Sequence, residues 1–580
     1  MPKRRDALKL GLAGAGAAAV NHVAQAASGP VPQSGLIFPQ TVRPSIEVRP
    51  SPPATPFVAP LNVMPIARPV DPSFLVPPPL PSAHQRYNEF LPQKIYYQRI
   101  SEFRWMYHPE YPYNQGSWSW GFNGITPGET FHARYGEPVL IRRANALPPV
   151  EQGHVGFALP SVTIHLHNGH TASESDGIPQ DYFDPGRFWD YHHANFPAGF
   201  DPRETMSTLW YHDHRMDFTG PNVYAGLTGF YLLFDERDSG NERDPSSRAF
   251  RLPSGKYDVP LILHDVQFDA NGQASWDFLN PTPVGGLPNE TYATNGMLGD
   301  RFTVNRIIQP HFKVERRKYR FRILNGGPSR LYNLSLRSDS SNRSARRGEK
   351  FTVVSTDGNM LTEPIEQTHI EVWVAQRHDV IVDFSAFKSG EHVYLVNHME
   401  MDPEGAGPTG RDNEAGDLIM RFDVGDAQGT DFSRIPDRLR ELPPIDMSRV
   451  RRRRLFVFDY VNGMWTINGK LMNPNRVDAA IEQGSAEIWT LRNAGNSWVH
   501  PIHTHFEEFQ ILEVNGKPVP RGSTDRSRKD VVSLGPNQDV TFYGRWRDFY
   551  GKHVMHCHNV VHEDHAMMLR WDIVQPGRGD

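Results

Sequence analysis

The chain has 580 residues, which is enough for two to four domains of ordinary size. Its formal net charge of −5 argues against general binding to nucleic acid. Cys557 is the only cysteine, so no intrachain disulfide exists and the cores must hold without covalent cross-links. The 50 prolines and 48 glycines favour turns and short strands over long helices.

The first 26 residues are predicted to be an export signal. Lys3-Arg4-Arg5 precedes an apolar run at 10–20, and Ala24-Gln25-Ala26 offers small residues for cleavage. Adjacent arginines before a weakly hydrophobic run are typical of a twin-arginine signal, which carries folded proteins. The run is shorter than the roughly 20 apolar residues that span a bilayer, so we expect no membrane span. We therefore predict a periplasmic or extracellular protein.

Residues 27–90 are predicted to be a proline-rich extended arm. Residues 29–90 contain 16 prolines, including Pro77-Pro78-Pro79. Such a stretch is extended and resembles polyproline, and it serves either as a linker or as an arm that lies over the folded body.

Short β-branched and apolar runs between turn residues predict strands over most of the remaining chain. They lie at 138–143, 161–167, 229–234, 259–263, 319–324, 351–355 and 380–384. Many short strands with little helical periodicity favour β-sandwiches, and the length suits three of them. Polar stretches at 237–251 and 425–453 are the predicted boundaries, and we interpret the block Arg451–Arg454 as a solvated linker.

Four histidine pairs, each spaced by two residues, are the strongest chemical signal. They are His165 and His167, His212 and His214, His503 and His505, and His556 and His558. In an extended segment residues i and i+2 face the same side, so each pair can present two imidazoles to one cluster of metals. Imidazole suits copper, zinc and iron alike. One such pair is usually a surface feature, but eight histidines in four pairs could hold three metal ions and leave room for dioxygen.

The only cysteine suggests a second metal site. Cys557 follows His556 on a predicted strand and therefore points to the opposite face, so one strand could serve two sites. A thiolate with two imidazoles and a weak thioether is the ligand set of a blue-copper centre, and His500, His562 and Met567 could complete it. The alternative is a buried structural cysteine beside ordinary core histidines.

These segments resemble the four signatures of the multicopper oxidases, and the closest resemblance is to the bacterial spore-coat laccase and bilirubin oxidase branch. The signatures are His165-Leu166-His167, Trp210-Tyr211-His212-Asp213-His214, His500-Pro501-Ile502-His503-Thr504-His505 and residues 556–567. Trp498-Val499-His500, Trp120–Gly124 and Arg317–Arg322 also resemble that branch. The likeness runs from about residue 120 to the C-terminus.

The resemblance implies an all-β fold of three cupredoxin-like Greek-key β-sandwich domains, which we expect at 91–240, 250–425 and 450–576. It also implies four copper ions: one type 1, one type 2 and a type 3 pair. The type 1 ion would lie in the third domain, and the other three would lie between the first and third domains.

The family pattern also implies the ligands. His500, Cys557 and His562 would hold the type 1 copper, with Met567 as axial ligand rather than its neighbour Met568. The type 2 copper would be held by His165 and His503. The type 3 pair would be held by His167, His212, His214, His505, His556 and His558.

In the implied reaction, a small reducing substrate gives one electron at a time to the type 1 copper through the edge of His500 or His562. Cys557 adjoins His556 and His558 in the chain, which gives a short route to the other three ions. Four electrons and four protons convert dioxygen to two waters. Asp176 and Glu563 match acidic residues of the family and are expected to supply the protons, although either could be a structural hydrogen-bond acceptor.

The leading hypothesis is an exported, monomeric, laccase-like oxidase of phenolic or bilirubin-like substrates. One alternative is a metallo-oxidase of cuprous, ferrous or manganous ions. Another is a non-catalytic cupredoxin scaffold, against which the full set of ten histidines, Cys557 and Met567 argues. The segment His398-Met399-Glu400-Met401 could bind a soft cuprous ion, but packing in a loop is the preferred interpretation.

Overall fold

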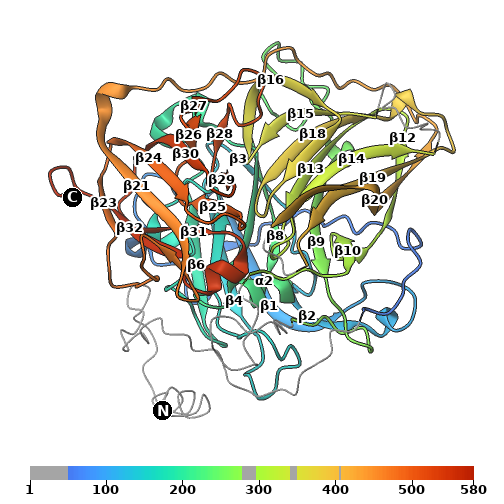
Figure 1. Ribbon diagram of the computed structural model, residues 1–580, viewed down its shortest axis with the longest axis horizontal. Helices are drawn as coiled ribbons and strands as arrows, with labels where there is room; N and C mark the ends of the chain where they lie inside the picture. Colours follow the sequence, from blue (N-terminus) through green and yellow to red (C-terminus); the bar gives the residue numbers. More distant parts are fainter. Residues whose placement is uncertain (1–49, 277–294, 340–348, 404–406) are drawn as a thin grey trace.

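The computed structural model describes residues 50–276, 295–339, 349–403 and 407–580 (Figure 1). The predicted export signal, residues 1–26, lies outside these residues. The described chain folds mainly into strands, which form six sheets that belong to three cores. No helix in these ranges is long and apolar enough to cross a membrane. The predicted all-β fold of three sandwiches is therefore confirmed.

Domain 1 consists of two four-stranded sheets with the orders β2-β1-β4-β6 and β3-β8-β7-β5. The first contains β1 (Lys94–Trp105), β2 (Ser117–Phe122), β4 (Val139–Asn145) and β6 (Phe188–His193). The second contains β3 (Phe131–Arg134), β5 (Ile164–His167), β7 (Thr208–Asp213) and β8 (Thr228–Phe234). Inward residues of both sheets, among them Trp120 and Tyr211, meet in one core. The helix α2 (Thr219–Ala225) lies between β7 and β8 in the chain.

Domain 2 has sheets with the orders β11-β10-β9-β13-β18-β15-β16 and β12-β20-β19-β14-β17. The first contains β9 (Asp258–Val266), β10 (Arg301–Val304), β11 (Ile307–Ile308), β13 (Lys318–Asn325), β15 (Phe351–Thr356), β16 (Asn359–Gln367) and β18 (Arg377–Asp383). The second contains β12 (His311–Glu315), β14 (Tyr332–Ser338), β17 (His369–Val372), β19 (His392–Met401) and β20 (Pro408–Gly425). Their shared core is the most aliphatic of the three.

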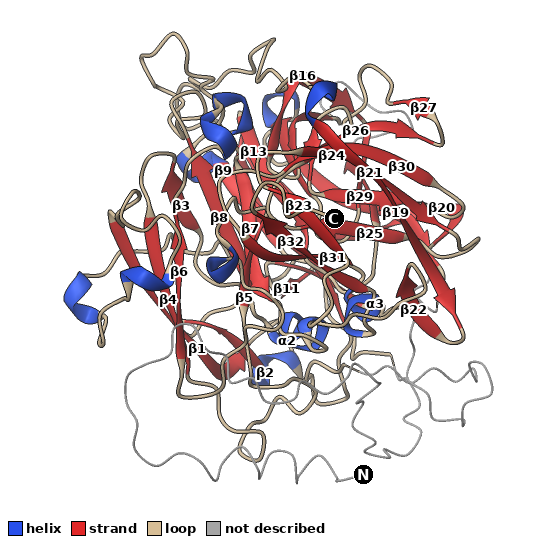
Figure 2. Cartoon of the chain, turned by 90° about the vertical axis from the view of Figure 1, so that its left-hand side faces the viewer, coloured by secondary structure: helices blue, strands red, loops and turns tan. Residues whose placement is uncertain are grey.

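Domain 3 has a sheet with the order β22-β21-β24-β30-β26-β27, with β28 beside β26, and a sheet with the order β23-β32-β31-β25-β29. The first contains β21 (Val450–Val461), β22 (Met464–Ile467), β24 (Ala486–Asn493), β26 (Phe509–Val514), β27 (Lys517–Pro518), β28 (Arg528–Lys529) and β30 (Asp539–Arg545). The second contains β23 (Ala479–Glu482), β25 (His500–Thr504), β29 (Val531–Leu534), β31 (Gly551–Cys557) and β32 (Met568–Val574). After β31, the short helix α3 (Val560–Asp564) lies against α2 of domain 1 (Figure 2).

Domains 1 and 3 place their histidine signatures on equivalent strands. The order β3-β8-β7-β5 in domain 1 repeats as β23-β32-β31-β25 in domain 3, with the same parallel and antiparallel pairings. In this register His165 lies opposite His212, and His503 lies opposite His556. The two halves of the candidate copper cluster are therefore built by the same local arrangement, used once in each domain.

The described part of the proline-rich segment, residues 50–90, is an arm that lies over all three domains. The amide of Leu61 donates to the carbonyl of His311 in domain 2 at 2.8 Å, and Ile66 forms a bridge to Thr130 in domain 1. Gln85 donates through Nε2 to the carbonyl of Tyr550 in domain 3 at 2.9 Å. The chain from residue 50 onward is thus fixed to the folded body before the first strand begins.

The interpretation of the arginine block as a linker is wrong. Arg451–Arg454 belong to β21, which pairs in parallel with β24. Along this part of β21 the partner on the other side, β22, has not yet begun, so the arginine side chains lie at an exposed sheet edge. Arg454 forms ion pairs with Glu487 at 2.6 Å and Asp580 at 2.8 Å. Charged residues suit such an edge because they oppose pairing with another chain.

Candidate metal centres

The eight paired histidines meet between domain 1 and domain 3, and all are buried. Their ligand atoms form three groups, each with its atoms within 4.8 Å of one another. The groups are His165, His167 and His503; His167, His212 and His558; and His214, His505 and His556. Each group takes residues from both domains, so neither domain could form one alone.

The ring nitrogens that face the centre of this cluster lie close to one another, and they have no hydrogen atom to donate to each other. Nε2 of His214 lies 3.1 Å from Nε2 of His505 and 3.2 Å from Nε2 of His556. In addition, Nε2 of His212 and both ring nitrogens of His558 are buried with no hydrogen-bond partner among the described residues. Buried polar atoms are normally paired, so this arrangement fits bound metal ions.

Two acidic residues, Asp176 and Glu563, hold the outward nitrogens of four of these rings. His505 donates its Nδ1–H to Oδ2 of Asp176 at 2.8 Å, and His165 donates to the carbonyl of Asp176 at 2.5 Å. The Nδ1 atoms of His214 and His556 lie 3.1 and 3.0 Å from the two oxygens of Glu563. These contacts fix the tautomer that leaves Nε2 free for a metal.

The protonation states suit metal binding. Burial lowers the pKa of His214 to about 4 and the pKa values of His212, His503 and His505 well below their usual value, so the imidazoles are neutral at neutral pH. Burial alone would raise the pKa of Glu563, but its contacts with His556 and His214 lower that pKa well below the usual value. The neutral His214 ring therefore lies against an ionised carboxylate, which favours a bound cation.

The second candidate site lies inside domain 3. The Sγ atom of Cys557 is 3.5 Å from Nδ1 of His500 and 3.5 Å from Nδ1 of His562, and these two nitrogens are 3.2 Å apart. All three residues are buried. Burial raises the pKa of the Cys557 thiol well above its usual value, so a cation must offset the charge of the thiolate. A thiolate with two imidazoles is the donor set of blue copper.

Met567 and Met568 face different surroundings. Met567 is fully buried in the core that contains Cys557, and its amide donates to the carbonyl of His562 at 3.0 Å. Met568 packs into a separate cluster with Met216 and Met472. Of the two methionines, only Met567 shares the surroundings of the thiol.

Strand β31 lies between the two candidate sites and contributes residues to both. Cys557 lies in the core of domain 3, whereas its neighbour His556 is in the cluster between the domains. His558 joins that cluster from just beyond the end of the strand. The opposite directions follow from the alternation of side chains along an extended chain.

One edge of the cysteine site is open to a surface pocket. The pocket has a volume of about 410 Å³ and is lined by Asp459, Tyr460, Trp465, Asn493, Ala494, Gly495, Asn496, Trp498, His500 and Asn537. His562 does not line it, because its Nε2–H donates to the carbonyl of Asn295 at 2.7 Å and Trp465 stacks on its ring at 3.9 Å. Of the two predicted entry points for electrons, His500 is the one that faces this pocket.

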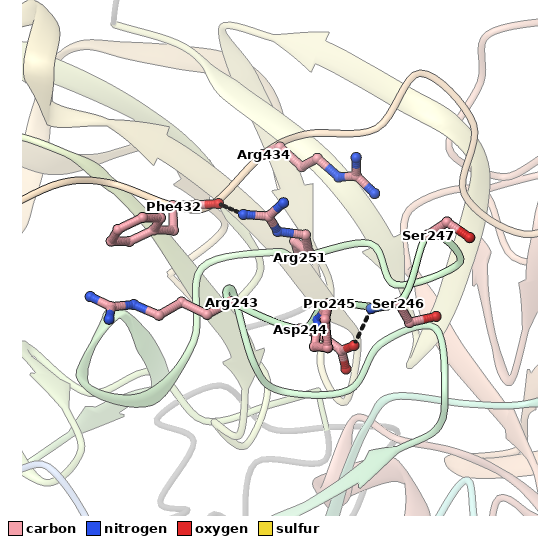
Figure 3. Close-up of a pocket in the computed structure, with 8 residues that line it drawn as sticks. All are labelled: Arg243, Asp244, Pro245, Ser246, Ser247, Arg251, Phe432 and Arg434. Carbon is pink, nitrogen blue, oxygen red and sulfur yellow. Dashed lines mark hydrogen bonds between the residues drawn. The ribbon is translucent and has the colours of Figure 1, made fainter.

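Another surface pocket, of about 360 Å³, carries three arginines but no sign of a ligand site (Figure 3). Arg251 donates to the carbonyl of Phe432 at 3.1 Å, and Arg434 donates to the carbonyl of Ala249 at 2.7 Å. Arg243 lies over the Phe432 ring at 4.2 Å. The three side chains point in different directions and already have partners.

Two other histidines near the signatures have partners outside the clusters. His170 contacts Oδ2 of Asp548 at 3.0 Å, and His192 donates to the carbonyl of Phe90 at 2.7 Å. The segment 398–401 lies in strand β19 and not in a loop, which corrects the prediction, although Met401 does pack in an apolar cluster. A residue that sequence reasoning missed is Asp530, which contacts both His167 and His503.

Comparison with known proteins agrees with this geometry. Family models described as multicopper oxidase match residues 107–238, 264–412 and 446–576. Bilirubin oxidase of Albifimbria verrucaria is 32% identical over 512 residues, covering 86% of this chain and 81% of that protein. Laccase of Bacillus subtilis (strain 168) is 29% identical over 527 residues, covering 83% and 95%. The crystal structure of a laccase from Pediococcus acidilactici superposes with a TM-score of 0.70 at 22% identity, over 91% of this chain and 96% of that one.

The three matched segments coincide with the three sandwiches, which confirms the cupredoxin-like fold, and the buried clusters supply the ligand types that type 1, type 2 and type 3 copper require. The chain therefore belongs to the multicopper oxidase family and is a copper-dependent oxidoreductase that uses dioxygen as acceptor.

Proposed function

We propose that this protein is a laccase-like oxidase of phenolic or bilirubin-like molecules. The pocket beside His500 is the observation that carries the proposal. Its walls are three aromatic rings, those of Tyr460, Trp465 and Trp498, together with asparagine amides. Such walls suit a flat organic molecule with hydrogen-bonding groups.

The same pocket argues against metal ions as the preferred reductant. Among the described residues that line it, Asp459 is the one carboxylate and none is a methionine. Hard cations such as manganous ion favour several oxygen ligands, and cuprous ion favours thioethers. An oxidase of metal ions would be expected to offer more oxygen ligands or more thioethers where electrons enter.

We further propose the ligands that the family pattern implies. His500, Cys557 and His562, with Met567 as axial ligand, would form the type 1 site, and His165 and His503 the type 2 site. The type 3 sites would be His167, His212 and His558, and His214, His505 and His556. Bound copper supplies one-electron redox chemistry and the reduction of dioxygen.

The protein itself provides the path for electrons to the cluster and the side chains that carry protons to it. Cys557 is bonded through the main chain to His556 and His558, so an electron that enters at His500 has a short covalent path to the cluster. Asp176 and Glu563 are buried carboxylates in direct contact with candidate ligands. We assign to them the transfer of protons to the cluster, because a buried reaction that consumes protons needs a carrier close by.

The test is steady-state oxygen consumption by the copper-loaded protein with a phenol, bilirubin, cuprous ion and manganous ion as separate reductants. The organic substrates are expected to give the higher kcat/KM. Replacing Trp498 with alanine should raise KM for the organic substrates more than for the ions, because it removes an aromatic wall of the pocket. A preference for metal ions by orders of magnitude would overturn the proposal.

We also propose that the protein acts outside the cytoplasm, because residues 1–26 have the features of a twin-arginine signal. Expression in a bacterial host followed by N-terminal sequencing of the secreted form should place the first residue just after Ala26. Arg4 and Arg5 replaced together by lysine should keep the protein in the cytoplasm. Export of that double variant at the normal level would contradict the proposal.

A further inference from the structure

Domain 2 offers none of the proposed copper ligands, yet one of its residues is linked through Asp530 to two of them. These two ligands belong to the trinuclear site, by which we mean the type 2 ion together with the type 3 pair. Arg377 is the first residue of β18, and its side chain is completely buried. Its Nη1 and Nη2 donate to the two carboxylate oxygens of Asp530 in domain 3 at 3.0 and 2.5 Å. Its Nε also donates to the carbonyl of Thr208 in domain 1 at 3.3 Å. This guanidinium is therefore shared by all three domains.

Asp530 in turn holds two of the proposed ligands through two different atoms. His167 donates its Nε2–H to the carboxylate Oδ1 at 3.2 Å, and His503 donates its Nδ1–H to the main-chain carbonyl at 3.0 Å. The two imidazole rings stack at 3.7 Å with an angle of 15° between their planes. One residue thus sets the orientation of both rings.

These two contacts select opposite tautomers. Because Nε2 of His167 carries the proton, its Nδ1 must face the cluster, and that atom is buried with no hydrogen-bond partner among the described residues. Because Nδ1 of His503 carries the proton, its Nε2 faces inward, 3.4 Å from Nε2 of His165. The site needs both tautomers at once: the Asp530 carboxylate, which Arg377 holds, sets the tautomer of His167, and the main-chain carbonyl of Asp530 sets that of His503.

We propose that Arg377 and Asp530 are positioning residues for the trinuclear copper site: they fix the ring orientation and tautomer of His167 and His503. Arg377 holds the carboxylate by a bidentate ion pair, which leaves the Asp530 side chain little freedom to rotate. Domain 2 would thereby control copper retention at the boundary between the other two domains. This inference rests on the proposed assignment of His167 and His503 as copper ligands.

A purely structural role for the ion pair is the competing explanation, and Arg320 provides a matched control. Arg320 lies in β13, beside β18 in the same sheet, and is equally buried. It forms ion pairs with Asp379 at 2.6 Å and with Asp238 at 2.9 Å, and it donates to Ser207 of domain 1 at 2.9 Å. Arg320 makes no hydrogen bond or ion pair to a proposed ligand among the described contacts.

The test compares Arg377→Met, Arg377→Lys, Asp530→Asn and Arg320→Met in the full-length protein reconstituted with copper. Copper per chain is measured after dialysis against a chelator, together with the EPR signals of type 1 and type 2 copper and the thermal midpoint. Arg377→Met is expected to weaken copper retention at the cluster about 10- to 100-fold and to change the type 2 signal. The blue type 1 absorption should remain, and Arg377→Lys should recover part of the loss.

Arg320→Met is expected to lower the thermal midpoint while leaving copper content and both EPR signals unchanged. If Arg377→Met behaves in the same way, the ion pair is structural only and the inference is wrong. If Arg377→Met does not fold, Asp530→Asn decides, because it keeps the shape of the side chain but not its charge: an unaltered type 2 signal would overturn the inference. A parent protein that lacks type 2 and type 3 copper would instead refute the proposed ligands.

Discussion

His562 donates its Nε2–H to the main-chain carbonyl of Asn295, which places a segment of domain 2 directly behind the candidate type 1 site of domain 3. The same carbonyl accepts a hydrogen bond from Nδ2 of Asn559 at 3.0 Å. Oδ1 of Asn559 accepts from Ser329 of domain 2 at 2.8 Å. The outward nitrogen of His562 is therefore fixed by a small network that crosses the domain boundary, and Nδ1 is left for the metal.

The first prediction concerns this network. Asn559 also caps α3 by accepting from the amide of Val561 at 3.2 Å. Asn559→Ser should keep the cap, since serine is a good N-cap residue, but lose the contact with the Asn295 carbonyl. We expect a shifted reduction potential of type 1 copper and an altered type 1 EPR signal, measured by redox titration of the blue absorption. A potential equal to that of the parent would show that the network does not tune the site.

The second prediction concerns the thiolate. Cys557→Ser replaces the soft ligand and should abolish the blue absorption and substrate oxidation together. The trinuclear site faces the other side of β31 and uses none of the Cys557 side chain, so its type 2 EPR signal should persist. Absorption spectra and EPR of the copper-loaded variant check this. Retention of substrate oxidation at the parent rate would mean that electrons enter elsewhere.

The local part of the site could be predicted from the sequence. Residues two apart in an extended segment share a face, which predicted that each pair addresses one cluster and that Cys557 points the other way, although His214, His505 and His558 lie one residue past the ends of their strands. The resemblance to a family then supplied the grouping of the pairs. The strands around them were also predictable, because short β-branched runs between turns carry their own signal.

The long-range part could not be predicted. Arg377 and Asp530 are far apart in the chain and belong to no spaced motif, so only the packing of domain 2 against domain 3 brings them together. Arg451–Arg454 were misread because charge composition does not distinguish an exposed edge strand from a linker. The contacts of the arm with three domains likewise depend on tertiary structure, since polyproline-like segments have no internal hydrogen bonds.

The third prediction concerns proton supply. Glu563 joins His214 of domain 1 to His556 of domain 3 through its two oxygens. Glu563→Gln cannot accept a hydrogen bond at both atoms or carry a proton, so oxygen reduction should slow by about 100-fold or more. The type 1 copper should still be reduced at the parent rate in anaerobic stopped-flow measurements. Normal turnover would contradict the proton role.

The last prediction concerns pH and a buried acid that touches no proposed ligand. Burial raises the pKa of Glu508 from 4.5 to about 7. The positive charge of Arg528, whose Nη1 donates to Oε2 at 3.1 Å, partly offsets this increase. The Oε1 atom has no hydrogen-bond partner among the described residues. The folded protein therefore binds this proton more tightly than the unfolded chain does. Stability from this group is present at low pH and is lost as the pH rises from about 4.5 through 7.

Glu508→Gln removes this dependence because the amide stays neutral. Relative to the parent, the variant should therefore gain thermal stability as the pH rises from 5 to 8, by an amount of the order of 3 kcal/mol in free energy once the parent carboxyl is fully ionised. Thermal midpoints of both copper-loaded proteins across that range measure the difference. Copper content and the EPR signals should match the parent at every pH. Parallel curves for the two proteins would show that Glu508 is ionised in both the folded and the unfolded state, and that its burial is fully offset by Arg528.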